Sequence, residues 1–540
     1  MKFPVCHLLP FFLISCLPPG NRATEMVAID SLSLKYHVEN LASDEFQGRK
    51  PFTTGEVKTV NYLKRQFEAY GLEPGNGSSY FQDVPMVEIG VTPSNTMKVS
   101  GGEEELELNL SEEFVAYTEQ VVAQTALKDS DLVFAGYGVV APEYGWNDYE
   151  GVDVKGKTVM VLVNDPGFAS GNSTLFKGKS MTYYGRWTYK YEEAARQGAA
   201  GCFIVHETVP AGYPWLVVRN SWSGSSLHLA TSGGKHRCAV QGWVSREAAR
   251  QIFEVSDQDL RNYAEKARTK GFQAVSLGLD VTVSLQNDIK KDVSKNVVAK
   301  ITGSKRPEET IIYSAHWDHL GIGSEIDQDS IYNGAHDNAT GIAALLGIAE
   351  AFVKAPKPER TVVFIAVTAE EQGLLGSKYY AENPIYDVSQ TIANINMDGI
   401  TYFGPMKDLT IIGYGQSEMD DLAEMIARKH GRYIIPDPDA GKGYFFRSDH
   451  FNFAKIGIPA LYASGSYEHM TKGIAYITKR NKEYLSSQYH RPQDEYDEKS
   501  WRFDGMALDA QLLYEVGSKL ANSDLRPRWK EGSEFKSIRE

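Results

Sequence analysis

The spacing of hydrophobic and polar positions changes several times along the chain, and each change predicts a different kind of element. Between residues 25 and 73 hydrophobic residues recur at helical spacing in SLSLKYHVENLA and VKTVNYLKRQFEAYG, and Gly71 offers an end to the second helix. Within residues 81–117, VPMVEIGV and ELELNL are separated by Gly and Asn, as is typical of short strands. The pattern predicts a helical N-terminal segment followed by β structure.

Residues 129–270 differ in character from the segments on either side. Strands are predicted in DLVFAGYGVV, GKTVMVLVND and AAGCFIVHE, and a helix that ends at Gly198 in TYKYEEAARQG. We expect an inserted, β-rich domain here. The main domain would then comprise an N-terminal part at residues 25–128 and a larger part at residues 271–525.

After residue 271, short apolar runs alternate with helical segments. Strands are predicted in VSKNVVAKITG, ETIIYSAHWD, TVVFIAVTAEE and TIANINMDG, and helices in GIAALLGIAEAFVKA and LLGSKYYAE. This alternation predicts an α/β fold with a mainly parallel sheet that helices cover on both faces. A chain of 540 residues also exceeds the usual size of one core, so two or more domains are expected.

The net charge limits the possible binding partners, and the N-terminal segment indicates the cellular compartment. The formal net charge of -14 disfavours nucleic acid, because phosphate binding needs an excess of Lys and Arg. Met1 and Lys2 precede an apolar run from Phe3 to Ser15, which suits a signal peptide and is too short for a membrane-spanning helix. We therefore expect export.

The cysteines also bear on the compartment of the protein. Leu13-Ile14-Ser15-Cys16 resembles a bacterial lipobox, so residues 1–16 would be a lipoprotein-type signal region and Cys16 a lipid anchor in the periplasm or at the outer membrane. Simple secretion is the alternative. Cys202 and Cys238 could form one disulfide or remain two buried thiols, and the sequence leaves both open.

Acidic residues and histidines follow several of the predicted strands. Because the carboxyl ends of parallel strands meet at one edge of a sheet, the residues after three of these strands are expected to converge. Imidazole and carboxylate groups are the ligands that zinc prefers. The five potential metal ligands are His316, Asp337, Glu371, Asp398 and His490.

Taken alone, these potential ligands also have structural interpretations that involve no metal. Asp337 could bridge two metal ions, or it could cap the helix that follows it. Asp318 could orient the His316 ring, whereas a histidine at a strand end is, taken alone, more often a hydrogen-bonded surface or core residue. His319 and His336 are nearby histidines that could be mistaken for ligands, so the choice of His316 rests on the pairing with Asp318 and on a family resemblance. For Asp398 the alternative is a turn residue, and for His490 a solvated loop histidine with Asp494 as its neighbour.

Glu370 and Glu371 follow a strongly apolar strand, which makes a solvated surface pair the weaker interpretation. One carboxylate could bind a metal while the other accepts a proton from water. Three carboxylates and one hydroxide would also balance the charge of two divalent ions in a partly buried site.

Together the motifs resemble the M28 family of zinc peptidases, the aminopeptidase and glutamate carboxypeptidase type. The resemblance rests on six segments spread over most of the chain: LASDEFQGRKPFTTGE, SAHWDH, GAHDNATG, TAEEQGLLGS, FRSDHFNFAKIGIPAL and YHRPQDEYD. It implies two Zn²⁺ ions, one bound by His316 and Asp398 and the other by Glu371 and His490, with Asp337 bridging. Residues 129–270 resemble the protease-associated domain that many members insert, which would act as a lid or specificity wall.

The resemblance also implies roles for residues that are not ligands. Glu370 would be the general base toward a water between the metals, and Tyr489 would stabilise the oxyanion. Arg447 would help to hold the substrate or would be a structural loop residue.

The expected protein is an exported aminopeptidase that acts on peptides. A carboxypeptidase or dipeptidase of the same family is the alternative, and it would need a basic pocket for a substrate carboxylate. A glutaminyl cyclase would use one zinc, and an inactive receptor-like protein would have lost ligands. Cobalt or manganese would suit the same donors, and neither substrate preference nor oligomeric state follows from the sequence.

Overall fold

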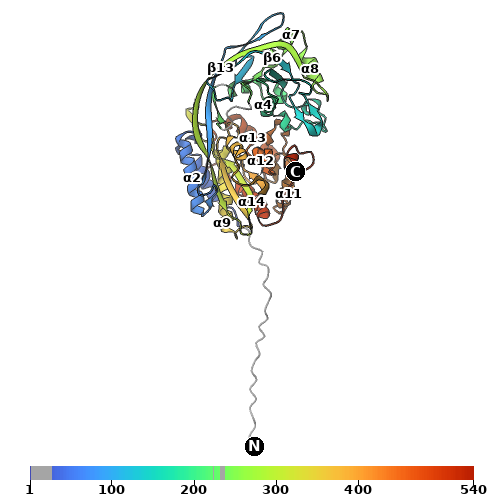
Figure 1. Ribbon diagram of the computed structural model, residues 1–540. Coiled ribbons are helices and arrows are strands. Elements are labelled where there is room, and N and C mark those ends of the chain that lie inside the picture. The colour runs from blue at the N-terminus through green and yellow to red at the C-terminus, as the bar shows by residue number, and fades with distance from the viewer. Residues whose placement is uncertain (2–26, 223, 231–236, 540) are drawn as a thin grey trace.

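The computed structural model describes residue 1 and residues 27–222, 224–230 and 237–539. The expected signal region and the anchor at Cys16 lie outside these ranges. Figure 1 shows two lobes, one with α4, α7 and α8 and one with α2, α9 and α14, with the long strand β13 (Val275–Ile301) running through both. Among the described helices, none is both long enough and apolar enough to cross a membrane.

The N-terminal helices form where the hydrophobic spacing predicts them. Helix α1 (Ser31–Leu41) begins after Asp30, whose side chain accepts from the Leu32 N–H, and α2 (Thr54–Tyr70) ends at Gly71 with φ of 82°. A left-handed residue at this point is a common helix end, and glycine adopts it without strain. The sequence prediction is confirmed for both helices.

The lobe that contains α9 and α14 is built on a mixed sheet with a parallel centre. Strands β17 (Arg360–Val367), β14 (Arg306–His316), β18 (Thr391–Asn396) and β21 (Ala460–Ser464) run parallel. Strand β13 lies antiparallel to β17 at one side, and β19 (Asp408–Ile411) lies antiparallel to β21 at the other. The α/β prediction is confirmed, and every residue of β17 is buried because both faces of the sheet are covered.

Helices cover the two faces of this sheet unequally. Ile311 and Tyr313 of β14 point into a large core that includes α1, α2, α9 (Thr340–Lys354) and α14 (Phe503–Ala521). Ile312, between them, points to the other face and a smaller core with α10 (Leu375–Glu382) and α12 (His450–Lys455). Alternation along one strand therefore fills both layers.

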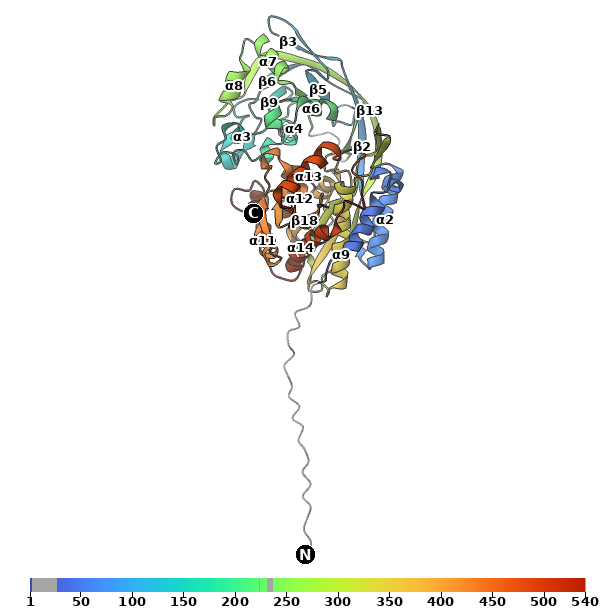
Figure 2. The ribbon, with the colours of Figure 1, turned by 180° about the vertical axis from the view of Figure 1, so that it is seen from behind.

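The strands of the other lobe belong to the same extended sheet, to which β13 connects them. Strands β6 (Gln124–Phe134), β9 (Thr158–Leu162), β10 (Gly201–Val205) and β12 (Val240–Val244) are parallel, and β5 (Phe114–Tyr117) is antiparallel to β12. Helices α4 (Trp187–Arg196), α7 (Arg246–Val255) and α8 (Leu260–Lys266) belong to this lobe (Figure 2). Cys202 and Cys238 are two free, buried thiols here, not a disulfide.

The two lobes touch through the segment before α4. The Met181 N–H donates to the Ala440 carbonyl at 3.2 Å, and Lys177 pairs with Glu534 at 2.6 Å. Tyr183 packs on Phe451 with ring centroids 5.2 Å apart. These contacts hold the N-terminus of α4 beside the loop that leads into α12.

Candidate metal centre

The carboxyl ends of the parallel strands bring three of the five predicted ligands to one edge of the sheet. His316 is the last residue of β14, Glu371 follows the end of β17, and Asp398 follows the end of β18. The register pairs His316 with Val367 and Ser314 with Asn396, so the three strands end side by side. The predicted convergence therefore occurs.

Asp337 faces two groups of donors, one with each carboxylate oxygen. Its Oδ1 lies 3.2 Å from His316 Nε2, which is also 3.4 Å from Asp398 Oδ1. Its Oδ2 lies 3.5 Å from His490 Nε2, which is 3.0 Å from Glu371 Oε2. All five predicted ligands thus meet around a single carboxylate placed as a bridge.

These separations suit a pair of metal ions. Four ligands held about 2.0 Å from a tetrahedral zinc ion lie about 3.3 Å from one another. The four separations between an imidazole nitrogen and a carboxylate oxygen in these two groups run from 3.0 to 3.5 Å. Imidazole and carboxylate donors are also the types that zinc selects, so the residues present fit two such ions.

The charge of the cluster also supports a site for divalent metal ions. Burial alone would lower the pKa of His490, but Glu371 and Asp337 raise it to about 10. Burial likewise opposes protonation of His316, yet Glu370 and Asp398 raise its pKa well above the usual range. Without metal, the surplus of carboxylates favours protonation of both imidazoles, and divalent cations would take the place of those protons.

Two buried aspartates support the loops that carry the ligands, although not in the way the spacing predicts. Asp318 Oδ1 is 3.7 Å from His316 Nδ1, whereas the Asp318 backbone oxygen is closer, at 3.2 Å. The Asp318 carboxylate instead accepts from the N–H groups of Glu370 and Glu371 at 3.0 and 3.4 Å. Its side chain thereby fixes the turn after β17.

Asp494 shows a similar difference. Its carboxylate accepts from the N–H groups of His336 and Asp337, both at 3.0 Å, so it holds the loop of the bridging residue and not His490. Asp337 itself caps no helix. The capping contact belongs to Asn338, whose Oδ1 accepts from the Gly341 N–H at 2.9 Å.

Two further residues join the cluster that the sequence reasoning did not select. His319 Nδ1 lies 2.6 Å from Glu371 Oε1, and its Nε2 is buried without a hydrogen-bond partner. Ser448 donates its hydroxyl to Asp398 Oδ2 at 2.6 Å. The spacing SAHWDH contained a signal for His319, since it lies only three residues after His316 at the same strand end.

Glu370 and Tyr489 lie at the same centre without joining the ligand groups. Burial raises the pKa of Glu370 well above its usual range, and the charges of Asp398 and Glu371 add to this against the lowering effect of His316. The Tyr489 ring stacks on His490 at a centroid distance of 3.8 Å. Both side chains therefore lie beside the two ligand groups.

Arg447 lies beside the centre and has few internal contacts. It directly precedes Ser448, donates through Nη2 to the Lys442 carbonyl at 2.6 Å, and stacks over the Tyr444 ring. Its Nε is buried without a partner.

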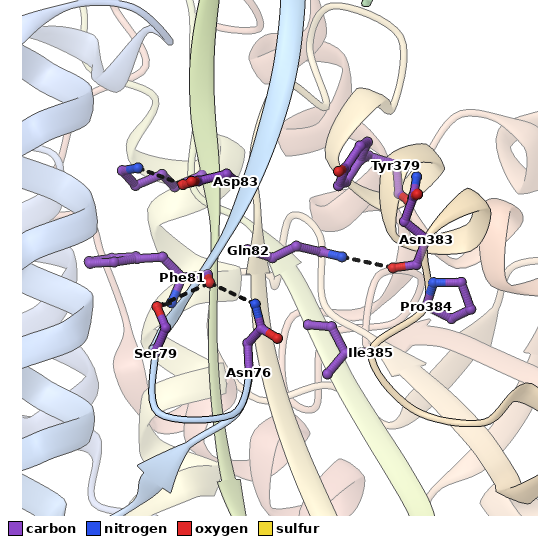
Figure 3. A pocket seen from close by; sticks show the side chains of 10 residues that line it. Asn76, Ser79, Phe81, Gln82, Asp83, Tyr379, Asn383, Pro384 and Ile385 are labelled. Carbon is purple, nitrogen blue, oxygen red and sulfur yellow. Dashed lines mark hydrogen bonds and ion pairs between the residues drawn. The ribbon is translucent and has the colours of Figure 1, made fainter. Parts of the chain in front are cut away.

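A separate hollow of about 720 Å³ lies away from these residues. Figure 3 shows it between strand β2 (Phe81–Pro93) and the end of α10, with Gln82 donating to the Asn383 carbonyl at 2.9 Å. None of the five predicted ligands lines it. The chemistry therefore concentrates at the strand ends and not in this hollow.

These features define an α/β protein with a candidate two-metal centre at the carboxyl ends of its parallel strands. Residues 296–514 match Peptidase family M28, so the chain carries a domain of that family, as its motifs predict. The matched segment begins within β13 and ends within α14.

Two curated relatives agree with this match. A "Probable zinc metalloprotease" of Pyricularia oryzae is 33% identical over 173 residues, 32% of this chain and 26% of that protein. Another of the same name, from Pyrenophora teres f. teres, is 33% identical over 204 residues, 36% of this chain and 38% of that protein. The chain thus matches less than two fifths of the length of either relative.

An aminopeptidase structure from Aneurinibacillus sp. strain AM-1 has a TM-score of 0.51 and 20% identity. It covers 92% of this chain and 96% of its own. At this identity the likeness concerns the fold.

Proposed function

We propose that the protein is a zinc-dependent aminopeptidase that uses two zinc ions. The observation that carries the proposal is Asp337, which presents one oxygen to the pair His316 and Asp398 and the other to the pair Glu371 and His490. His319 is a further donor beside Glu371. Bound zinc ions would polarise the scissile carbonyl and make water acidic near neutral pH.

Glu370 would move the proton. Its carboxylate takes a proton from the attacking water as the C–O bond forms, and it later gives that proton to the nitrogen of the leaving amine as the C–N bond breaks. A pKa raised by burial brings this carboxyl closer to the working pH. Asp318 holds the Glu370 backbone N–H at 3.0 Å and so fixes where the side chain starts.

Tyr489 would stabilise the charge that develops on the carbonyl oxygen. Its ring is held against His490, so its hydroxyl can donate to that oxygen, a contribution of about 3 kcal/mol in comparable sites.

Two likenesses support the aminopeptidase activity: the fold is similar to that of the Aneurinibacillus aminopeptidase, and a segment of 127 residues, 22% of this chain, is 32% identical to the mouse "Aminopeptidase NAALADL1". The test is a set of matched peptides with free and acetylated N-termini, assayed on protein loaded with zinc and on protein treated with a chelator. We expect cleavage of the free-amine peptides only, lost on chelation and restored by zinc. Equal cleavage of the acetylated peptides would exclude an aminopeptidase.

A carboxypeptidase or dipeptidase is the second candidate, because the structure contains a basic pair next to the centre. Arg186, at the N-terminus of α4, has a pKa lowered to about 10 by burial and by the charge of Arg447. The Nε atoms of both arginines are buried without partners, and among the described residues no carboxylate lies within ion-pair distance of either. Two neighbouring cations without a counterion would favour a substrate carboxylate.

Peptides with a free or an amidated C-terminus separate the two candidates. If the basic pair binds the terminal carboxylate, amidation and the variant Arg186→Met should each raise KM about tenfold or more, and together no further. An aminopeptidase without such a subsite should have the same KM for peptides with a free and with an amidated C-terminus.

Export and a lipid anchor at Cys16 are part of the proposal. Their support is the sequence of residues 1–16 alone. Incorporation of labelled palmitate that is lost in Cys16→Ala would bear it out, and a soluble, unlabelled mature protein would contradict the anchor.

A further inference from the structure

A buried arginine lies beneath the candidate metal centre and is not one of its ligands. Arg49, in the N-terminal motif LASDEFQGRKPFTTGE, is 2% exposed. Its guanidinium donates four hydrogen bonds, all to backbone carbonyls: Nε to Trp317 at 2.9 Å, Nη1 to Leu41 and Asn333 at 2.6 Å each, and Nη2 to Gly334 at 2.8 Å. Four of its five N–H groups are thus used.

Three of the four acceptors belong to loops that carry ligands. Trp317 directly follows His316, and Asn333 and Gly334 lead into the loop of Asp337. The fourth, Leu41, ends α1 and fixes the arginine to the helical layer. One planar group therefore joins the loop of one ligand to the loop of the bridging ligand.

The loops are held from two chemically opposite sides. Asp318 and Asp494 accept from backbone N–H groups at Glu370, Glu371, His336 and Asp337. Arg49 instead donates to backbone carbonyls. Among the described residues no carboxylate lies within ion-pair distance of it. Burial lowers the pKa of Arg49 to about 10, while the nearby charges of Asp494 and Asp318 oppose that shift.

The local sequence is suited to this approach. Gly48 has φ of +62°, and a Cβ built there would lie 2.5 Å from the Tyr332 carbonyl oxygen and 2.6 Å from that of Gly321. Only glycine lets residue 48 pass this close to the strands β15 (Gly321–Ile326) and β16 (Asp329–Tyr332), so that Arg49 can reach the loops.

We propose that Arg49 is a positioning residue of the metal centre, which fixes the loops of His316 and Asp337 relative to each other before the metals bind. The inference rests on the proposed two-metal centre and extends it beyond the M28-matched segment, because Arg49 lies outside residues 296–514. The centre is then completed by the N-terminal segment.

The variant Arg49→Lys tests this, with Arg360→Lys as its matched control. Arg360 is also buried, at 1% exposure, and donates to the carbonyls of Leu520 and Leu525 at 2.7 and 2.8 Å. Unlike Arg49 it also donates to the Glu309 carboxylate, and it starts β17 at the end away from the ligands. Zinc affinity is measured by chelator competition on the full chain, with thermal unfolding of the metal-free proteins alongside. We expect Arg49→Lys to weaken zinc binding about 10- to 100-fold and Arg360→Lys to leave it unchanged, although both lower the unfolding temperature.

Wild-type zinc affinity in Arg49→Lys would overturn the proposal. A wild-type protein that binds no zinc would refute both this inference and the proposed function, whereas zinc binding without peptidase activity would refute only the function.

Hydrogen exchange on the wild-type protein gives a test that needs no folded variant. If Arg49 orders the loops, the N–H groups of His336 and Asp337 should exchange slowly even without metal. Exchange that becomes slow only when zinc is added would contradict the proposal.

Discussion

Each lobe buries a cluster of charged residues, and the two clusters differ in whether every polar atom of the cluster has a partner within the protein. In the lobe with α4, Lys190 is fully buried and donates to the carbonyls of Asn164 and Tyr184 at 2.8 and 2.6 Å. Asp165 and Asp148 lie beside it and accept hydrogen bonds of their own, for example from Thr182 Oγ1 and Trp146 Nε1, both at 2.8 Å. The cluster is satisfied internally.

The cluster at the strand ends is not satisfied in this way. Its carboxylates outnumber its bases, so both His316 and His490 have raised pKa values, and His319 Nε2 has no partner. A buried polar network that is complete rigidifies a core, whereas a buried polar atom without a partner costs free energy until a proton or a ligand satisfies it. This difference distinguishes the candidate site from a structural network of similar composition.

Replacing Glu370 by Gln should have the largest effect of the changes considered. The variant keeps the volume of the side chain and removes its capacity to accept a proton, so we expect kcat to fall about 10²- to 10⁴-fold. Zinc content, measured on the same sample, should be unchanged because Glu370 belongs to neither ligand group.

Glu371→Gln is the matched control for that variant. It alters the adjacent side chain, which contacts His319 and His490, and should lower both activity and zinc content. A fully active Glu370→Gln variant would refute its role as the base.

Replacing Lys190 by Met should destabilise the other lobe without affecting zinc. Removing one partner of a buried charge cluster typically costs about 3 to 5 kcal/mol, because Asp165 and Asp148 lose their only buried cation of the cluster. Chemical denaturation would measure the loss, and zinc affinity below the unfolding transition should match the wild-type. A loss of zinc affinity would show that the two clusters are coupled.

Much of the candidate site could be predicted from the sequence, because the apolar strands fix where the ligands converge. The periodicity located β14, β17 and β18, and the strand ends place Glu371, Asp398 and a histidine at one edge of the sheet. The choice of His316 over His319 depended on the expected pairing with Asp318 and on the family resemblance. His490 depended on the family resemblance, since it lies in a polar loop after α13 (Gly473–Ser487).

The supporting contacts could not be predicted, because they join segments far apart in the chain. Spacing suggested that Asp494 serves His490, yet it holds the loop of Asp337, 157 residues earlier. Arg49 reaches Gly334 across 285 residues. Such pairings depend on the packing of loops, which hydrophobic spacing does not encode.

The unmatched charge should also give the metal-free protein a distinctive pH dependence. The pKa of His490 is raised from 6.5 to about 10, so its contribution to stability is complete below about pH 6.5 and is lost as the pH rises toward 10. The pKa of His316 is also raised, so its contribution to stability is likewise lost as the pH rises. Glu371, lowered to about 2, contributes above about pH 4.5 and loses that contribution only as the pH falls toward 2.

Denaturation of the metal-free protein at about pH 6 and about pH 8.5 checks this sign. We expect lower stability at the higher pH without zinc, and a larger stabilisation by zinc there, because bound imidazoles must be neutral. Stability that stays constant or rises over this interval without zinc would show that the imidazoles are not held as cations.

The buried thiols offer the smallest effect, and they test whether the lobe with α4 is as closed as the internal hydrogen bonds of its cluster imply. Burial raises the pKa of Cys238 to about 12 and that of Cys202 well above its usual range, so little thiolate forms at neutral pH. Because the thiolate is the reactive species, we expect alkylating reagents to label neither cysteine in the native protein and both after unfolding. Reductant should leave the unfolding temperature unchanged, since the thiols are free, whereas a chelator should lower it. Rapid labelling in the native state would show that this lobe opens to solvent. Its cluster would then differ less from the incompletely satisfied cluster at the strand ends.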